Sequence, residues 1–368
     1  MPTIVFYILT LATFAAIYGV LALGLNVQWG YAGILNFMYI AFVAVGGYVT
    51  SLLMLPPAQP ALLGESYVLG LNWPFIPALI VGGLAAALLA FIVGLLSLKR
   101  LRSDYFAIVT VAVALVLWTI AGNDTALVNG WDGISAIPQP FFNALNLDYN
   151  SYGFFFLGLC IVILIIVYIF SERLYRSPFG RALRTVREDE LVAQGLGKNV
   201  FSLRLKAFVI GAFIAGIGGA LLVMSVGAFN PSAWTTGETF FIWAALLLGG
   251  SANNRGALLG ALLVPVLFSE ATRFLPSVSS SPQLIDALRY IAIGILIILT
   301  VAFRPQGLLA ERRFKVRRSK LLAPELAAAG GGTGIHVEDE VIAAEHSNLV
   351  SPDSSAGEDR EEEASDGR

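Results

Sequence analysis

The sequence opens with the stretch IVFYILTLATFAAIYGVLALGL at residues 4–25, which contains no charged side chain. An α-helix rises ~1.5 Å per residue, so ~20 apolar residues cross the hydrocarbon core of a bilayer. No charged residue precedes Glu65, and this stretch is too long for one buried helix of a soluble protein. Over the whole chain 57% of residues are hydrophobic and 13% are charged, about half the charged share of soluble domains. The composition indicates an integral membrane protein and excludes soluble globular and nucleic-acid-binding classes.

Further apolar runs of spanning length follow the first one, at residues 33–55, 75–97, 105–121, 152–171, 206–228, 256–275 and 287–303. A shorter run at 238–250 cannot cross the bilayer as a straight helix, and it is interpreted as half of a broken helix. Only helices and closed barrels satisfy their backbone polar groups in lipid. The runs therefore predict an all-α, polytopic transmembrane protein with about 8–10 spans, some of them broken.

Most basic residues of the first 320 residues lie in three segments outside the runs. They follow the third run, at Lys99, Arg100 and Arg102, fill the segment 172–206, and follow the last run. The loops at 56–74 and 122–151 contain no Lys or Arg. By the positive-inside rule the basic segments are cytoplasmic and the other two loops are external. The N-terminus is then expected outside and the C-terminus in the cytoplasm.

The chain divides by composition into a transmembrane domain at 1–320 and an acidic tail at 321–368. The tail holds twelve acidic residues and two Arg, and it is rich in Gly, Ser and Ala. Such a segment buries too little apolar surface to offset its ordering entropy, so it is expected to be disordered. With one cysteine, Cys160, and both histidines in this tail, the sequence favours neither a disulfide framework nor a metal site.

The charged stretch GRALRTVREDELVAQGLGKN at 180–199 stands out between two apolar runs. Ser177 and Pro178 form a helix-start signal, with Ser as the N-cap and Pro at the first helical position. The acidic cluster at 188–190 suits the start of a second helix, and Gly195 and Gly197 suit its end. The pattern predicts two short charged helices at the cytoplasmic membrane face.

Motifs for catalysis are absent from the sequence. It contains no phosphate-binding G-x-x-x-x-G-K-[ST] loop, no G-x-S-x-G and no H-E-x-x-H. Ionisable residues lie near the ends of the runs, whereas ion-coupled carriers keep them at mid-membrane. The chain is therefore not expected to be an enzyme, and the positions of its ionisable residues argue against an ion-coupled secondary transporter, which stays as the alternative transport class.

Polar residues inside the apolar regions cluster in two places, and both contain glycine. These candidate translocation-path residues are Asn26, Gln28, Gly30, Gly33 and Asn36 in the first region and Gly249, Gly250 and Asn253 in the second. An amide in lipid must face protein or a cavity. Two interpretations stay open: hydrogen bonds between helices, or a path lined by broken helices whose freed backbone groups contact substrate.

Six stretches in chain order resemble the membrane permease of ABC importers for branched-chain amino acids, the LivM-type subunit. They are GLNVQWGYAGILNF (24–37), LRSDYFAIVTVAV (101–113), NGWDGISAIP (129–138), SPFGRALRTVREDELVAQGLGKNV (177–200), ETFFIWAALLLGGSANNRGALLGALL (238–263) and FRPQGLL (303–309). The resemblance implies a multi-pass permease of the prokaryotic plasma membrane, in contact with lipid, that needs no cofactor. It implies three kinds of partner: a second permease subunit of the LivH type, two ATPase subunits, and an external solute-binding protein. Urea and short amides remain alternative substrates.

The resemblance also assigns a role to the charged stretch. In ABC importers a permease loop with an E-A-A-x-x-x-G pattern docks into a cleft of the ATPase. Here only Ala193 and Gly197 keep that pattern. The resemblance implies that the segment 172–206 is the coupling loop, with the residues Arg184, Arg187, Glu188, Asp189, Glu190, Ala193 and Gly197 at the contact.

Overall fold

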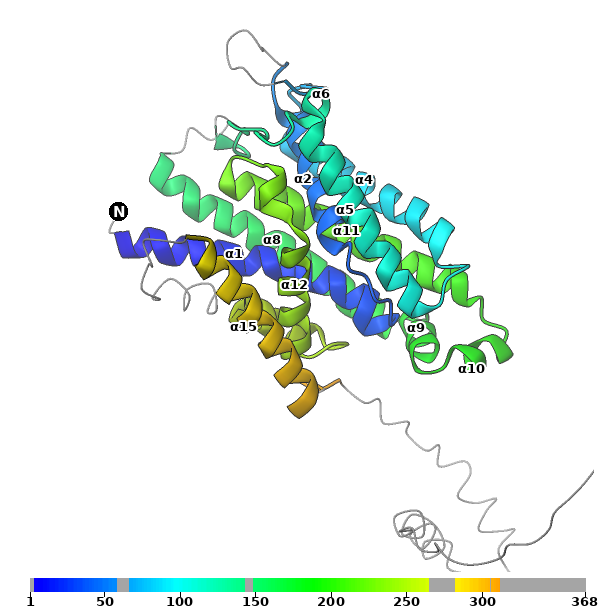
Figure 1. The fold of residues 1–368 in the computed structure, drawn as a ribbon. Helices are drawn as coiled ribbons and strands as arrows, with labels where there is room; N and C mark the ends of the chain where they lie inside the picture. Colours follow the sequence, from blue (N-terminus) through cyan, green and yellow to red (C-terminus); the bar gives the residue numbers. More distant parts are fainter. Residues whose placement is uncertain (1–2, 58–65, 143–147, 265–281, 305, 312–368) are drawn as a thin grey trace, which may run out of the picture. The chain divides into compact units, whose positions relative to one another are not determined.

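The computed structural model describes residues 3–57, 66–142, 148–264, 282–304 and 306–311. The helices are α1 (Thr3–Asn26), the π-helical turn η1 (Val27–Tyr31), α2 (Tyr39–Met54), α4 (Phe75–Ser97), α5 (Ser103–Asn123), α6 (Thr125–Val128), α8 (Tyr149–Arg176), α9 (Pro178–Glu188), α10 (Glu190–Gly195), α11 (Val200–Val226), the 3₁₀ turn η2 (Pro231–Trp234), α12 (Thr236–Gly249), α13 (Asn254–Leu262) and α15 (Pro282–Phe303) (Figure 1). Across these ranges the only β-pairing is two isolated bridges. The all-α prediction is confirmed.

Internal contacts group the chain into two units, Met1–Arg312 and Arg313–Arg368. Every helix described here belongs to the first unit. The predicted acidic tail at 321–368 lies outside the described residues, so its disorder stays a prediction.

Five helical stretches are long and apolar enough to cross a membrane: Ile4–Tyr31, Phe75–Ser97, Ser103–Asn123, Ser151–Arg176 and Val200–Val226. Two shorter apolar helices, Tyr39–Met54 and Ile291–Phe303, accompany them within the described residues. A multi-pass membrane protein is therefore confirmed. The predicted run at 256–275 is described only as far as residue 264, and the total number of spans stays a prediction.

The second predicted run begins later as a helix than its hydropathy suggests. Its apolar residues start at 33, but α2 starts at Tyr39. Gly33 has a φ of +65°, outside the right-handed helical region, and the chain continues as an irregular link to Met38. This link is the interruption expected between residues 26 and 36.

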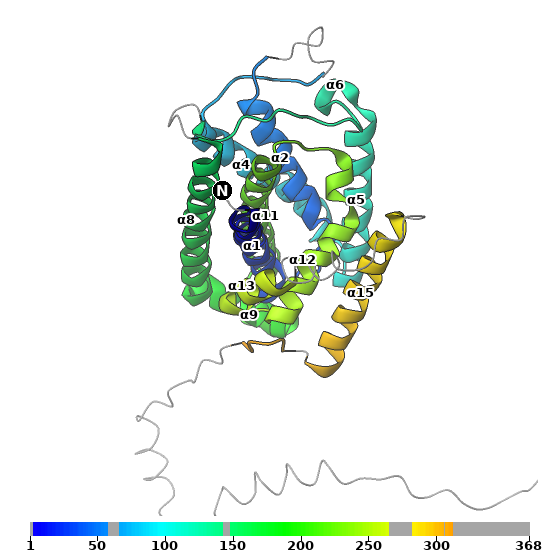
Figure 2. The ribbon, with the colours of Figure 1, turned by 90° about the vertical axis from the view of Figure 1, so that its left-hand side faces the viewer.

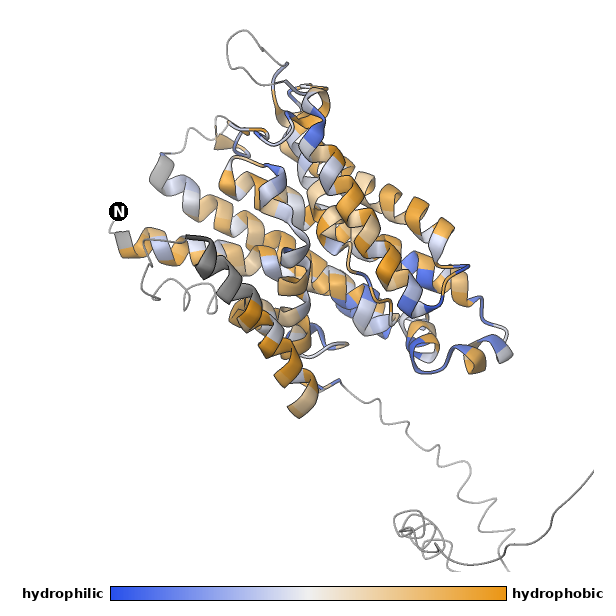
Figure 3. Ribbon diagram, viewed as in Figure 1, coloured by the Kyte–Doolittle hydropathy of each residue, from blue (hydrophilic) through white to orange (hydrophobic). Residues whose placement is uncertain are grey.

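The helix α11 lies with α1 at the centre of the described helices, inside a ring of α8, α4, α2, α5, α12 and α13 (Figure 2). Of its most apolar window 72% of residues are buried, against 17% for α8. The outward faces of α4, α5 and α8 expose large apolar side chains such as Leu88, Ile108 and Ile166. Outward apolar side chains of this kind are those that contact lipid, and Figure 3 shows that the long helices consist mainly of hydrophobic residues.

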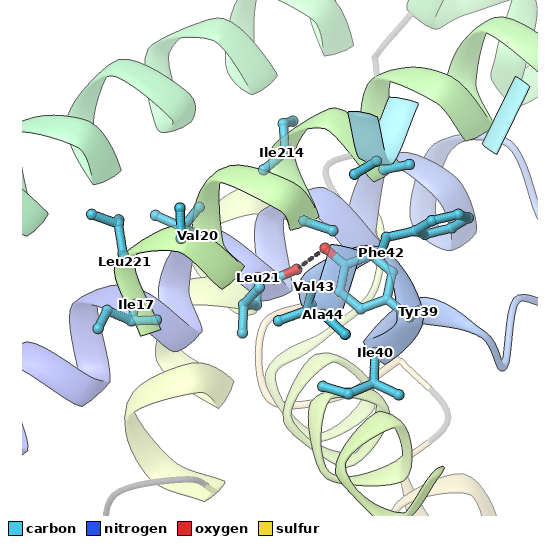
Figure 4. Packing of buried hydrophobic residues seen from close by; sticks show 14 of the residues in the cluster. Ile17, Val20, Leu21, Tyr39, Ile40, Phe42, Val43, Ala44, Ile214 and Leu221 are labelled. Carbon is cyan, nitrogen blue, oxygen red and sulfur yellow. Dashed lines mark hydrogen bonds between the residues drawn. The ribbon is translucent and has the colours of Figure 1, made fainter. Parts of the chain in front are cut away.

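Close packing around α11 depends on small residues. A Cβ added to Gly219 would lie 1.9 Å from the carbonyl oxygen of Val43 on α2. Around this contact the side chains of α1, α2 and α11 interdigitate, among them Ile17, Phe42 and Leu221 (Figure 4). The hydroxyl of Tyr39 donates to the carbonyl of Leu21 at 2.7 Å. Small residues at such contacts let helix backbones approach in a membrane, where no hydrophobic force drives helices together.

The loops that connect the helices lie at two opposite ends of the first unit. At one end the segments without Lys or Arg contact each other: Val68 N donates to Leu127 O at 3.3 Å, and Ile134 N donates to Phe229 O at 2.9 Å. At the other end lie the two short helices α9 and α10, where hydrophilic residues gather (Figure 3). The grouping agrees with the charge pattern of the sequence.

The helices α12 and α13 form a tight antiparallel pair that turns at residues 250–253. A Cβ on Gly249 would lie 2.0 Å from the carbonyl oxygen of Gly256, and one on Gly260 would lie 1.8 Å from that of Ala245. α12 has 14 residues, too few to cross the hydrocarbon core. The interpretation of 238–250 as half of a broken helix agrees with this turn.

A substitution at Gly219 tests the packing of the central helix. In Gly219→Val the added atoms meet the backbone of α2, which has no rotamer to escape to, so we expect a loss of about 1–3 kcal/mol or more of stability. Gly158 on α8 is the control, because a Cβ there meets nothing within 4 Å. Thermal unfolding of the purified protein in detergent should show a marked loss for Gly219→Val and little change for Gly158→Val. Equal melting of the two variants would contradict the packing described.

Candidate functional site

The two interrupted regions meet at the side chain of Asn26. Its Nδ2 donates to Oδ1 of Asn254 at 3.0 Å, and its Oδ1 accepts from the backbone N–H of Ala252 at 2.8 Å. Asn26 is fully buried at the end of α1, while Ala252 and Asn254 form the turn between α12 and α13. One amide therefore joins two helix ends that lie more than two hundred residues apart in the sequence.

The same junction extends to α8 through Tyr31 and Asn254. The hydroxyl of Tyr31 donates to Oδ1 of Asn254 at 2.5 Å, and it also lies 3.2 Å from the carbonyl oxygen of Ser171. The amide nitrogen of Asn254 donates to the carboxylate of Glu172 at 3.0 Å, and Glu172 forms an ion pair with Arg176 at 2.6 Å. Polar groups of α1, α8 and α13 thus satisfy one another at the end of the bundle where α9 lies.

A second buried pair links the irregular segment 32–38 to α11. The side chain of Gln28 donates to the carbonyl oxygen of Phe208 at 2.8 Å and accepts from Nδ2 of Asn36 at 2.8 Å. Asn36 accepts from the N–H of Met38 at 3.0 Å, and its own carbonyl accepts from the indole of Trp243 on α12 at 2.9 Å. These contacts hold the irregular segment against both α11 and α12.

All three predicted amides, Asn26, Gln28 and Asn36, are fully buried and hydrogen-bonded within the chain. This is the first of the two interpretations offered by the sequence, bonds between elements. Their contact with substrate stays a prediction. The sequence did not indicate that Tyr31 and Glu172 bond Asn254, because a tyrosine and a glutamate near a helix end are common.

The path candidates of the second region, Gly249, Gly250 and Asn253, pack against the segment after α15. Leu309 N donates to the carbonyl of Gly249 at 3.0 Å, and Asn253 Nδ2 donates to that of Ala310 at 3.0 Å. Gly250 has a φ of +115°, and a Cβ there would lie 2.2 Å from the carbonyl oxygen of Leu309. Glycine is required here so that residues 306–310 can run beside the α12–α13 turn.

The charged stretch forms the two short helices that its caps predict. Ser177 Oγ accepts from the N–H of Gly180 at 3.1 Å at the start of α9. The carboxylate of Asp189 accepts from the N–H groups of Leu191 and Val192 at 2.8 and 3.0 Å at the start of α10. α10 ends with a hydrogen bond from Lys198 N to Ala193 O at 3.1 Å, and Gly197 has a φ of +71°. This is the Schellman pattern, in which glycine takes the left-handed position.

The structure corrects the orientation expected for Ala193. That residue was predicted to face the partner protein, but it is fully buried in a small cluster with Val186 and Val200. Instead, α10 and its C-cap expose Leu191 (78%), Val192 (54%) and Leu196 (66%). Ala193 is small because α9 and α11 pack closely on that side of α10.

Most of the charged residues that were expected at the ATPase contact bond within the chain instead. The guanidinium of Arg184 lies 4.4 Å from the ring centre of Tyr175, and Glu190 pairs with Arg204 at 2.8 Å. Asp189 caps α10, and Glu188 is exposed. Arg187 donates to the carbonyl oxygen of Gly30 and forms an ion pair with Glu311 at 2.6 Å. These charges therefore order the loop itself.

A polar groove lies beside α10. It has a volume of about 320 Å³ and is lined by residues of the 98–99 turn, α10 and the start of α11, among them Lys99, Gln194, Lys198 and Phe201. In the part of the chain that the structure describes, no cluster of three or more His, Cys, Asp or Glu side chains is arranged to hold a metal ion.

The fold is that of a polytopic α-helical membrane protein: long apolar helices surround a buried central helix, and buried amides join two interrupted helices. A family model described as "Branched-chain amino acid transport system / permease component" matches residues 7–301. The chain belongs to this permease family.

Curated relatives agree with the family assignment. The chain is 34% identical over 323 residues to the high-affinity branched-chain amino acid transport system permease protein LivM of Escherichia coli K12, covering 82% of this chain and 70% of the relative. It is 30% identical to the probable permease protein LivM of Methanocaldococcus jannaschii, covering 80% and 91%. It is 28% identical to the probable permease protein LivH of the same archaeon, covering 81% and 90%. No solved structure gives a significant match.

The Asn26 junction can be tested by an isosteric change. In Asn26→Leu the N–H of Ala252 and the amide of Asn254 each lose a partner in a buried site, so we expect a loss of about 1–3 kcal/mol in stability. Asn123, an exposed residue that bonds only within its own helix α5, is the control. Thermal unfolding in detergent should show a lower midpoint for Asn26→Leu and an unchanged one for Asn123→Leu. A wild-type midpoint for Asn26→Leu would show that the junction is not held by these bonds.

Proposed function

We propose that this chain is the membrane-spanning permease subunit of an ATP-driven ABC importer, and that it moves branched-chain or related amino acids across the plasma membrane. The family match over residues 7–301 and the names of the LivM relatives support the substrate class. The subunit catalyses no covalent chemistry in this proposal. Urea and short amides gain no support from the relatives described above.

In the proposed assembly this chain has three kinds of protein partner: a second, LivH-type permease subunit, two ATPase subunits and an external solute-binding protein. It is also in contact with lipid. The similarity to a LivH protein supports pairing with a related but different permease chain. The sequence has no phosphate-binding G-x-x-x-x-G-K-[ST] loop, which supports ATP hydrolysis by separate subunits. Specificity would then be set largely by the solute-binding protein that delivers the ligand.

One observation carries the proposed contact with the ATPase: the apolar surface on α10. Leu191, Val192 and Leu196 are exposed on α10 and its C-cap, in a segment where hydrophilic residues gather. An exposed apolar patch with a polar rim is typical of a protein-binding surface. The polar groove lined by Lys99, Gln194 and Lys198 lies next to it. We infer that this patch enters a cleft of the ATPase, with Gly197 providing the tight exit of the chain.

The position of the patch supports a coupling role. α9 packs against α8, α10 and α11 and contacts η1, so a displacement of α10 would act on the end of α1. ATP binding in the partner subunits would shift the permease pair between inward-open and outward-open states. Such shifts are rigid-body movements of packed helices around an interface.

Charged substitutions on the patch test the proposed function. In Leu191→Glu/Leu196→Glu the buried apolar contact with the ATPase is replaced by two charges, so we expect loss of ATPase co-purification and of leucine uptake in membrane vesicles. Leu127→Glu is the control, an exposed leucine on the short helix α6 at the opposite end. The wild-type assembly should take up leucine and not urea.

Two outcomes of this experiment would contradict the proposal. One is a wild-type chain that never co-purifies with an ATPase subunit. The other is a double variant that retains both co-purification and uptake. Insertion is checked by equal abundance of the variants in the membrane fraction.

Orientation is tested by thiol labelling. We propose that the end with residues 66–73 is external and the end with α9 and α10 is cytoplasmic, because the basic residues gather at the latter. An impermeant maleimide should label Leu71→Cys in sealed cells and should label Lys198→Cys only after permeabilisation. Both positions are exposed, and the native Cys160 is buried. Labelling of Lys198→Cys in sealed cells would contradict this orientation and place α10 outside the cell.

A further inference from the structure

Arg187 makes a contact that the docking of an ATPase does not require. It lies on α9, yet its guanidinium donates to the carbonyl oxygen of Gly30, in the π-helical turn that ends α1. Its other terminal nitrogen pairs with Glu311, after α15, at 2.6 Å. One side chain thus joins the coupling segment to two segments of the membrane domain that lie 157 and 124 residues away in the sequence.

We propose that Arg187 is the positioning residue that transmits movement of α9 and α10 to the interrupted end of α1. This inference rests on the proposed function, since it assumes that α10 binds an ATPase. It assigns the transmission to one clamp made by Arg187, the Gly30 carbonyl and Glu311. Arg187 touches neither substrate nor nucleotide in this proposal.

The first argument is the chemistry of the site on α1. The last carbonyl groups of a helix have no partner within the helix, and they form the negative end of its dipole. The chain leaves the helical path at Gly33, whose φ is +65°. The Gly30 carbonyl therefore needs a donor from outside, and a guanidinium supplies both the hydrogen bond and the complementary charge.

The second argument is close packing at the same place. A Cβ added to Gly33 would lie 3.0 Å from Cγ of Arg187. The stem of the arginine thus lies against the backbone of the interrupted segment, and the side chain as a whole is only 23% exposed. A shift of α9 carries Arg187 with it, so it must either move the two segments that Arg187 contacts or break the ion pair and the carbonyl contact together.

The third argument is that the clamp continues into the buried amide network. The second carboxylate oxygen of Glu311 lies 3.4 Å from the hydroxyl of Tyr175. The ring of Tyr175 lies 5.2 Å from the ring of Tyr31, and Tyr31 bonds Asn254 at the start of α13. A displacement of Arg187 therefore reaches both interrupted regions through adjacent contacts.

Lysine is a poor substitute in this geometry. The planar guanidinium offers donors in a fixed fork, which here contact a carbonyl on one side and a carboxylate on the other. An ammonium group has one nitrogen and cannot hold the same two acceptors at the same positions. Arg187→Lys therefore keeps the charge of α9 and removes the bridge.

The experiment measures uptake per ATP hydrolysed in proteoliposomes that contain the complete transporter. For Arg187→Lys and for Glu311→Gln we expect ATPase co-purification and ATP hydrolysis to persist, while leucine uptake per ATP falls about tenfold, within the ~5–150-fold range of couplings between sites. Arg181→Lys is the matched control, because Arg181 is an exposed arginine of the same helix whose guanidinium donates locally, to the carbonyl oxygen of Arg176 at 3.3 Å. It should keep wild-type coupling.

A double-mutant cycle separates the clamp from independent effects. If Arg187 and Glu311 act as one unit, Arg187→Lys/Glu311→Gln should lose no more coupling than the worse single variant. Losses that multiply, or wild-type coupling in Arg187→Lys, would overturn the inference while leaving the proposed function intact. Absence of ATPase from the purified wild-type complex would instead overturn the proposed function.

Discussion

The structure depends on the need to satisfy backbone and amide groups where helices are interrupted inside a membrane. Each unsatisfied polar group in lipid costs several kcal/mol, and this chain interrupts two apolar helices. Asn26 provides partners for both interruptions. Its amide oxygen accepts from the N–H of Ala252, and its amide nitrogen donates to the side-chain oxygen of Asn254. The interrupted helices are therefore possible only as a pair, and the remaining polar contacts are arranged around that pair.

A second constraint is the close approach of helices in the absence of a hydrophobic driving force between them. The buried helix α11 meets α2 at Gly219 with backbone contact, and α12 meets α13 through glycines as well. These contacts keep the central helices in fixed register, and the outer helices α4, α5 and α8 present their large apolar residues outward. Movement of the membrane domain must then occur by sliding or tilting of packed units.

Much of the architecture could be predicted because its signals are local. Apolar runs gave the long helices, Ser177 and Asp189 act as helix caps through bonds to their near neighbours, and Gly197 takes the left-handed position at the end of α10. The helix α11 starts at Val200, six residues before the predicted apolar run at 206–228. Asn199 caps its first turn, and the residues that follow include the charged Arg204 and Lys206.

The long-range contacts could not be predicted from one sequence. Nothing near Arg187 indicates Gly30 or Glu311, and nothing near Tyr31 indicates Asn254. Ala193 matched a docking pattern, yet it is buried because Val186 and Val200 pack on that side. A pattern identifies residues that share a helix, but the side on which each of them lies depends on helices elsewhere in the chain.

The junction at Asn26 also has a consequence for the order of events during synthesis. α1 leaves the ribosome before α12 and α13, and Ala252 follows Asn26 by 226 residues. At ~5–20 residues per second the partner is made about 11–45 s after the amide that needs it. During that interval the amide of Asn26 lacks both partners, and water at the edge of the bilayer can satisfy it where the hydrocarbon core cannot. The newly made chain therefore passes through a period in which α1 has been made but the turn between α12 and α13, which its last residue bonds, has not.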